Sequence, residues 1–89
     1  MKIYRVCEVV SGDRALVTLR SAEEDYWEEM GFVVGNTVNV YIGADGHTIS
    51  GDALVAKVNA REICLEFALE KLPHLSVGFV ARPAGRKTL

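Results

Sequence analysis

Short runs in which apolar and polar residues alternate follow one another along the chain, and this period of two is typical of strands. The first run, Ile3 to Val10, is rich in β-branched residues and ends at a turn cluster, Ser11-Gly12-Asp13. The second run, Arg14 to Arg20, places alternate side chains on one face, namely Ala15, Val17 and Leu19. We therefore predict two strands in the first twenty residues.

The same pattern returns after residue 36. A strand is predicted from Thr37 to Ile42, followed by a hairpin connection at Gly43-Ala44-Asp45-Gly46 and a return strand that begins at His47. Ser50-Gly51-Asp52 is expected to interrupt the return strand, and Asn59-Ala60 is a plausible two-residue loop before a further strand. A last strand is expected at residues 75–79. The inward residues that we expect to form one core are Val38, Val40, Ile42, Leu54, Ala56, Val58, Ile63, Leu65, Val77 and Phe79.

Two segments have the spacing of helices instead. Ser21 and Glu24 form a capping-box pattern, and Ala22, Tyr26 and Met30 recur every fourth residue, which predicts a helix over residues 21–30. Helix formers at residues 67–72 predict one or two turns that Pro73 ends. The fold class expected is mainly β, a small barrel or sandwich of five to six short strands, with one short helix after the second strand and a one- to two-turn helix before the last.

The chain has 89 residues, enough for one domain, and we assign residues 1–82 to that domain and residues 83–89 to a flexible basic tail. The chain has ten basic and twelve acidic residues, which gives a net charge of -2. The excess of positive charge that is typical of a strong nucleic-acid binder is therefore missing. No apolar run approaches the length of a membrane span, and charges at Lys2, Arg5 and Glu8 interrupt any signal-peptide core, so we expect a cytoplasmic protein without membrane insertion.

Motifs for catalysis or for metal binding are not apparent. The sequence contains neither a P-loop nor a Gly-x-Ser-x-Gly elbow. The soft metal ligands are Cys7, His47, Cys64 and His74, and no two of them have the close spacing that zinc sites normally show. We expect reduced, structural thiols, no enzymatic activity, no cofactor and no metal site.

Two ordered segments resemble the FeoA-like domain family. Met30-Gly31-Phe32-Val33-Val34-Gly35-Asn36-Thr37-Val38-Asn39-Val40 is similar to the family's M-G-[hydrophobic]-x-x-G-x-x-V-x-V signature. The segment from Gly51-Asp52 to Leu65 is similar to its later G-D-P-[hydrophobic] segment, although Ala53 replaces the usual proline and Ala60 the usual glycine. The resemblance covers residues 24 to 78, and each half alone is weak.

The resemblance implies an SH3-like β-barrel that acts as a non-enzymatic, cytosolic accessory to ferrous iron transport. Its partner would be the GTPase-bearing cytosolic part of a FeoB-type membrane permease. Two alternatives stay open: an SH3-like nucleic-acid-binding module, favoured by the basic residues Arg82, Arg86 and Lys87, and a small enzyme or iron-binding protein.

The predicted contact surface for a partner lies on the helix over residues 21–30, where the resemblance departs most from the family pattern. This helix carries five acids and no base, and Glu28 and Glu29 near its C-terminal end are not explained by helix stability. Trp27 is either an anchor for a partner or a cover for the barrel mouth. We predict a patch for a basic partner formed by Tyr26, Trp27, Glu28 and Met30 and bordered by Asp45 and His47 of the hairpin.

Overall fold

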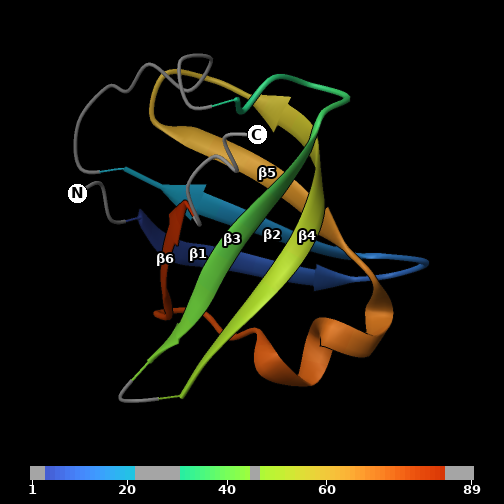
Figure 1. Ribbon diagram of the computed structural model, residues 1–89, viewed down its shortest axis with the longest axis vertical. Coiled ribbons are helices and arrows are strands. Elements are labelled where there is room, and N and C mark those ends of the chain that lie inside the picture. The colour runs from blue at the N-terminus through green and yellow to red at the C-terminus, as the bar shows by residue number, and fades with distance from the viewer. Residues whose placement is uncertain (1–3, 22–30, 45–46, 84–89) are drawn as a thin grey trace, which may run out of the picture.

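The computed structural model describes residues 4–21, 31–44 and 47–83, which form a closed antiparallel β-barrel (Figure 1). Its strands are β1 (Tyr4–Ser11), β2 (Ala15–Arg20), β3 (Thr37–Ala44), β4 (His47–Val58), β5 (Glu62–Phe67) and β6 (Val80–Pro83). Around the barrel they follow the order β1-β2-β5-β4-β3-β6. The prediction of a small, mainly β barrel is confirmed.

The short last strand closes the barrel. β6 pairs with both β1 and β3, so that Ala81 lies opposite Tyr4 on one side and opposite Ile42 on the other. Hairpins join β1 to β2 and β3 to β4, and β5 pairs with β2 and β4 in the middle of the ladder. Closure leaves no long unpaired strand edge in this part of the chain.

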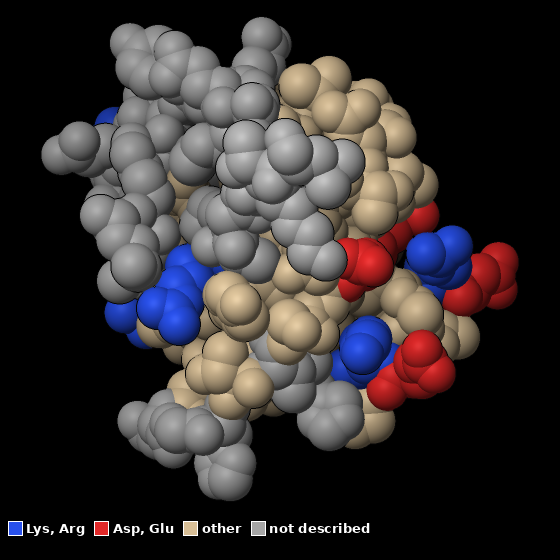
Figure 2. Space-filling model, in the orientation of Figure 1, with Lys and Arg blue, Asp and Glu red and all other residues tan. Residues whose placement is uncertain are grey.

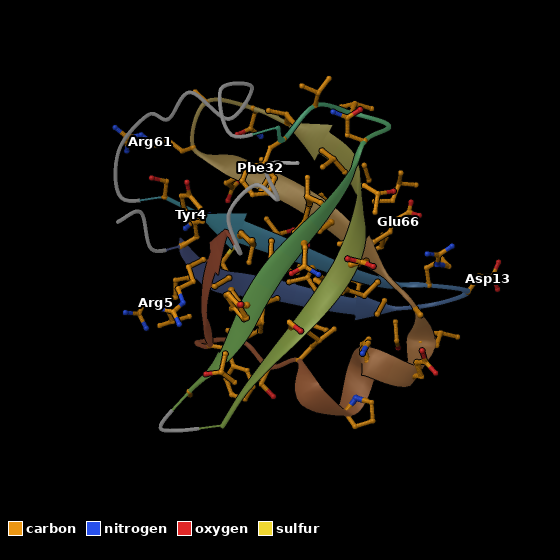
Figure 3. The ribbon with its side chains drawn as sticks, viewed as in Figure 1. Tyr4, Arg5, Asp13, Phe32, Arg61 and Glu66 are labelled. Carbon is orange, nitrogen blue, oxygen red and sulfur yellow. The ribbon has the colours of Figure 1, made fainter. Side chains whose placement is uncertain are left out.

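The barrel interior is a single apolar core, and Figure 3 shows Arg5, Asp13, Arg61 and Glu66 projecting outward from the ribbon. Many expected inward residues are buried, namely Ala15, Val17, Leu19, Val40, Ile42, Ile63 and Leu65. Val38, Val58 and Phe79 pack against this core while partly buried. The expectation was wrong for Val77, which is 65% exposed.

The predicted phase of β4 was also wrong, because Ala53 and Val55 are buried whereas Leu54 and Ala56 are only half-buried. A register shift between Val55 and Lys57 inserts one extra residue into β4. Such a bulge changes the face to which the following side chains point. Counting every second residue back from Val58 therefore selects the wrong side of the strand.

Gly51 does not interrupt β4, which runs without a break from His47 to Val58. It is buried opposite Val40, beneath the ring of Phe67. A Cβ at this position would lie 3.3 Å from Phe67 Cε2. The glycine thus marks a close approach between strand and ring and not the turn that the sequence suggested.

After β5 the chain forms a 3-10 helix, η2 (Leu69–His74), in place of the helix expected at residues 67–72. η2 lies beside one end of the barrel in Figure 1, and it is the only helical segment of the described residues. Pro73 lies inside η2 and does not stop it, since the fixed φ of proline matches that of a 3-10 helix. No helix in this part of the chain is long and apolar enough to span a membrane.

The strand expected at residues 75–79 is instead an irregular connection. Leu75 is buried, Phe79 N–H donates to the Ser76 carbonyl, and Gly78 has a φ of 94°, a left-handed conformation that glycine tolerates. Gly78 N–H and the Phe79 carbonyl both bond to the backbone of Val6. The period-two pattern of this segment therefore does not correspond to regular pairing, and β6 begins only at Val80.

The segment Met30 to Val40, which resembles the first FeoA-like motif, contains two glycines in the loop before β3, and the backbone conformation there explains them. Gly31 and Gly35 have φ values of 87° and 92°. Between them Phe32 turns inward, and its ring meets that of Tyr4 edge-on, with centroids 6.4 Å apart. The helix predicted over residues 21–30 falls almost wholly on residues 22–30, outside the described residues, as do residues 84–89 of the predicted tail.

Candidate functional site

A row of outward-facing polar residues crosses the barrel wall from β1 to β4. Glu8 lies opposite Thr18, Thr18 opposite Cys64, and Cys64 opposite Lys57. A register shift stands at each end of this row, and in β1 the inserted residue is Cys7. Bulges change the direction in which side chains point and are frequent beside functional sites. The surface around this row is therefore the first candidate for a site.

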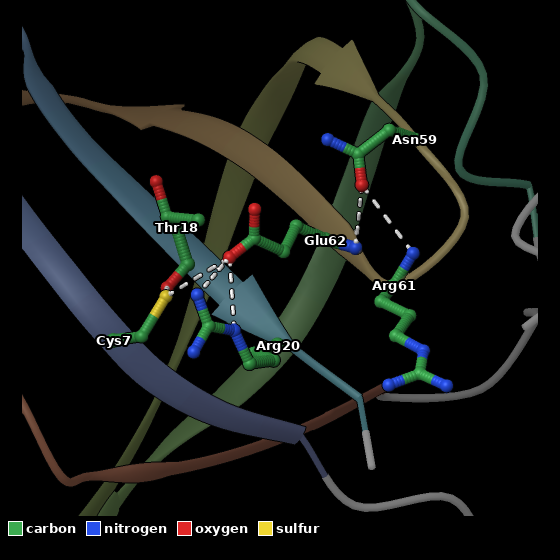
Figure 4. A network of polar contacts seen from close by, with 6 residues as sticks. All are labelled: Cys7, Thr18, Arg20, Asn59, Arg61 and Glu62. Carbon is green, nitrogen blue, oxygen red and sulfur yellow. Dashed lines mark hydrogen bonds and ion pairs between the residues drawn. The ribbon is translucent and has the colours of Figure 1, made fainter. Parts of the chain in front are cut away.

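The side chains beside this row form a polar network that Figure 4 shows from close by. Arg20 donates to Glu62 Oε2 from Nε at 2.9 Å and from Nη2 at 2.6 Å. Cys7 Sγ lies 3.4 Å from the Thr18 carbonyl oxygen and 3.8 Å from Glu62 Oε2. Because Arg20 is 62% exposed and Glu62 30%, water screens this ion pair and it adds little to stability.

The turn before β5 holds Glu62 in place. Asn59 Oδ1 accepts hydrogen bonds from the N–H of Arg61 at 3.3 Å and of Glu62 at 3.0 Å. β4 ends at Val58 and β5 begins at Glu62, so the connection has three residues, 59–61, and not the two that were expected. Within it Asn59 N–H donates to the Glu62 carbonyl. An asparagine side chain that caps its own turn explains the longer loop.

The two thiols of this surface are held in their protonated form. Burial raises the pKa of Cys7 above its ordinary value of 9.0, and the neighbouring Glu62 carboxylate adds to the effect while Arg20 opposes it. Burial likewise raises the pKa of Cys64, although its hydrogen bond with Thr18 works in the other direction. The thiolate is the reactive and metal-binding form of cysteine, so this environment disfavours both nucleophilic attack and metal ligation.

The described residues contain no group of three or more His, Cys, Asp or Glu side chains placed to hold a metal ion. Cys7 and Cys64 lie on β1 and β5, His47 begins β4, and His74 ends η2. This finding does not extend to His47 and His74, whose side chains lie outside the described part of the structure.

The predicted contact patch is not tested by the structure. Tyr26, Trp27, Glu28, Met30 and Asp45 lie outside the described residues, and for His47 only the backbone, paired with Ala44, is described. The patch remains a prediction.

Three open hollows follow one another around the outside of the barrel. The first, of about 490 Å³, lies over the polar network and is lined by Cys7, Arg20, Lys57 and Cys64 among others. The second, of about 520 Å³, shares Cys7 and Arg20 with it and extends to Arg5, Val77 and Gly78. The third, of about 510 Å³, shares Arg5 and Gly78 with the second and adds Tyr41, Gly43, Thr48 and Arg82.

Sequence reasoning did not identify Arg5 and Tyr41 as parts of a surface, because the pairing of β6 with β1 and β3 is what brings them near Arg82. The sequence contains only a weak indication that these two residues belong to one surface. Both residues occupy outward positions of their strands, and the sequence groups Arg82 only with Arg86 and Lys87, as basic residues that favour a nucleic-acid-binding module.

Comparison with known proteins finds no family model that matches the chain, no similar curated protein and no similar solved structure.

Proposed function

We propose that the chain is a non-enzymatic binding module of the FeoA type. In this proposal it acts in the cytosol as an accessory of ferrous iron transport, through contact with the GTPase-bearing cytosolic part of a FeoB-type permease.

The observation that carries the proposal is the way in which the two family-like segments meet. Val55 N–H donates to the Asn36 carbonyl, and Gly35 N–H donates to the Val55 carbonyl, each at 2.9 Å. Val40 lies opposite Gly51 in the β3–β4 ladder. Two motifs that are individually weak thus form one structural unit, as the barrel implied by the resemblance requires.

A binding role also agrees with where the polar groups lie. Apart from the hydroxyl of Tyr4, the buried side chains of the described core are apolar, so the charged groups of this part of the chain lie on the outer face. The hollows on that face are open, whereas sites for small substrates are typically deep clefts that enclose most of the ligand. An outer surface with shallow hollows is better suited to a macromolecular partner.

The test is direct binding to the GTPase-bearing cytosolic part of a FeoB-type permease. We expect titration calorimetry or biolayer interferometry with purified proteins to give saturable binding with one site. Absence of binding at protein concentrations of about 100 μM would contradict the proposal. A matched control is the Val40→Ala variant described below, which reports whether binding depends on an intact barrel.

A second candidate function is that of an SH3-like nucleic-acid-binding module. The observation that favours it is the convergence of Arg5, Tyr41 and Arg82 on one hollow. A phosphate-tracking site would make log K fall linearly with log salt, by about 0.7 to 0.9 for each phosphate neutralised. The NMR titrations proposed in the next subsection include an oligonucleotide to test this function.

A further inference from the structure

The second and third hollows adjoin at Arg5 and Gly78 and are here together called the basic groove. Its lining includes Arg5, Tyr41, Thr48, Val77, Gly78 and Arg82. It passes over β3, β6 and β1 and reaches the connection that precedes β6. Gly78 and Arg5 line both hollows, so the two hollows meet at these residues.

Contacts within the barrel orient both arginines of the basic groove. The Arg82 guanidinium lies over the Tyr41 ring, with its Cζ 5.3 Å from the ring centroid. Arg5 Nη1 donates to the Gly78 carbonyl at 3.2 Å. A guanidinium has five donors, so the contact with Gly78 leaves most of the donors of Arg5 for a ligand. Orientation by stacking and hydrogen bonding reduces the entropy lost when a carboxylate binds.

The lining of the basic groove contains no acidic residue in the part of the chain that the structure describes. In Figure 2 the blue side chains on the left of the molecule lie apart from red ones, whereas those on the right alternate with red. The first hollow differs, since Glu8 and Glu62 line it together with Arg20 and Lys57. Among the described lining residues of the basic groove, the charged side chains are therefore all basic.

An exposed apolar side chain lies beside these charges. Val77 is 65% exposed, more than any other large apolar residue described, and it lines the second hollow next to Gly78. Val80, half-buried, lines the third hollow. The groove thus offers cationic and apolar contacts along one path.

We infer that the basic groove binds an extended acidic segment of a partner protein, in which carboxylates pair with Arg5 and Arg82 and an apolar side chain packs on Val77. The inference rests on the proposed function, a contact with a partner protein. It specifies which surface of the barrel makes that contact and that the partner's contact segment is acidic. Arginine pairs with carboxylates through two parallel hydrogen bonds, which gives both charge complementarity and directional selectivity.

A carboxylate ligand fits this surface better than a single-stranded nucleic acid. Binding of single strands depends on aromatic rings on which successive bases stack. Among the described lining residues the aromatic rings are Tyr41, over which Arg82 lies, and Tyr4, which is 1% exposed. A base would therefore have to displace the guanidinium before it could stack on that face of Tyr41.

The test is a titration of ¹⁵N-labelled protein followed by two-dimensional NMR. The probe is the synthetic peptide Gly-Glu-Glu-Leu-Asp-Glu-Gly, and parallel titrations use a peptide with lysine at every acidic position and the oligonucleotide pentathymidylate. We expect the acidic peptide to shift the amide signals of Tyr41, Gly43, Gly78 and Arg82 and to bind at least tenfold more weakly when NaCl rises from 25 to 250 mM.

Substitutions assign this binding to the two arginines. Arg5→Glu with Arg82→Glu should weaken peptide binding at least tenfold, whereas Arg61→Glu, a charge reversal at an exposed position outside the groove, should change it less than twofold. Arg5→Lys with Arg82→Lys keeps the charge and the fold and should weaken binding by an intermediate factor, because lysine lacks the planar fork.

The inference is overturned if pentathymidylate binds more tightly than the acidic peptide, if the shifted amides lie elsewhere, or if Arg61→Glu weakens binding as much as the double reversal. It is also overturned if a FeoB-type cytosolic part binds the wild-type protein and the double reversal equally well, in which case the proposed function stands. Peptide binding in the groove without FeoB binding supports the inference and contradicts the proposed function.

Discussion

The thiols of Cys7 and Cys64 lie half-buried on the outer face of the barrel, and this position alters their acidity. Partial burial disfavours the thiolate, and the carboxylates nearby disfavour it further. A fully exposed cysteine on the same strands would titrate near its ordinary pKa. The residue type alone is therefore a poor guide to reactivity here.

We predict that the rate of alkylation by iodoacetamide will rise with pH along a curve whose apparent pKa is higher in the folded protein than in the protein unfolded by urea. Glu62→Gln should lower the apparent pKa of Cys7, because it removes a neighbouring negative charge and leaves Arg20 in place. Mass spectrometry of each labelled cysteine makes the measurement. Equal pKa values in folded and unfolded protein would contradict it.

The same shifts predict how stability depends on pH. A thiol whose pKa is raised by folding stabilises the native state below pH 9, and this contribution is lost as the pH rises through the folded pKa. Wild-type protein should therefore lose more stability between pH 8 and pH 10 than the Cys7→Ser, Cys64→Ser double variant. Urea denaturation at several pH values tests this, and identical losses would show that the thiols do not contribute.

Gly51 is a second residue whose role depends on its surroundings. We predict that Gly51→Ala destabilises the protein by about 0.5 to 2 kcal/mol, since the new Cβ crowds Phe67 while alanine recovers part of the backbone entropy. Gly12→Ala is the matched control, because a Cβ there meets no atom within 4 Å. Urea denaturation that shows equal effects for the two variants would contradict the close approach.

At the scale of elements, alternation correctly predicted strands whose pairing is regular and failed where the backbone departs from a period of two. β2 and β5 pair in register over their full length, and their inward residues follow from the sequence except for Phe67, which the sequence assigns to the helix expected over residues 67–72. The bulge in β4 and the left-handed Gly78 have no such signature, because each depends on partners distant in sequence. Val77 was therefore assigned to the core although it is exposed.

The loop from Gly31 to Asn36 permits a test at this scale. We predict that Gly35→Ala costs about 1 to 2 kcal/mol, because a φ of 92° is strained for alanine and the hydrogen bond from residue 35 to Val55 fixes the loop in this conformation. Thermal and urea unfolding measure the cost. An unchanged stability would mean that the loop relaxes without loss, and the role assigned to this glycine would be wrong.

At the scale of the whole molecule, the class of fold was predictable and the candidate surface was not. A barrel follows from the number and spacing of short strands, whereas the basic groove unites residues from β1, β3 and β6 that are up to 77 positions apart, such as Arg5 and Arg82. The net charge of -2 also concealed it, since a total over the chain does not report how the signs are distributed.

The single core gives a global prediction. Val40 is 1% exposed on β3, and Val40→Ala should lower the free energy of unfolding by about 1 to 3 kcal/mol. Val10→Ala removes the same atoms from a side chain that is 46% exposed on β1 and should change stability by less than about 0.5 kcal/mol. If urea denaturation shows that Val40→Ala and Val10→Ala lower the free energy of unfolding by the same amount, the assignment of Val40 to the core is wrong.

The closure of the barrel by β6 also has a consequence during synthesis on the ribosome. β1 emerges first, yet one of its two neighbours is not translated until Val80, 76 residues after Tyr4. At roughly 5 to 20 residues per second the β1 edge waits about 4 to 15 seconds for that partner. The nascent chain therefore passes through a stage in which β1 and β3 already have β2 and β4 to pair with, while the edges that will flank β6 are still open to chaperones.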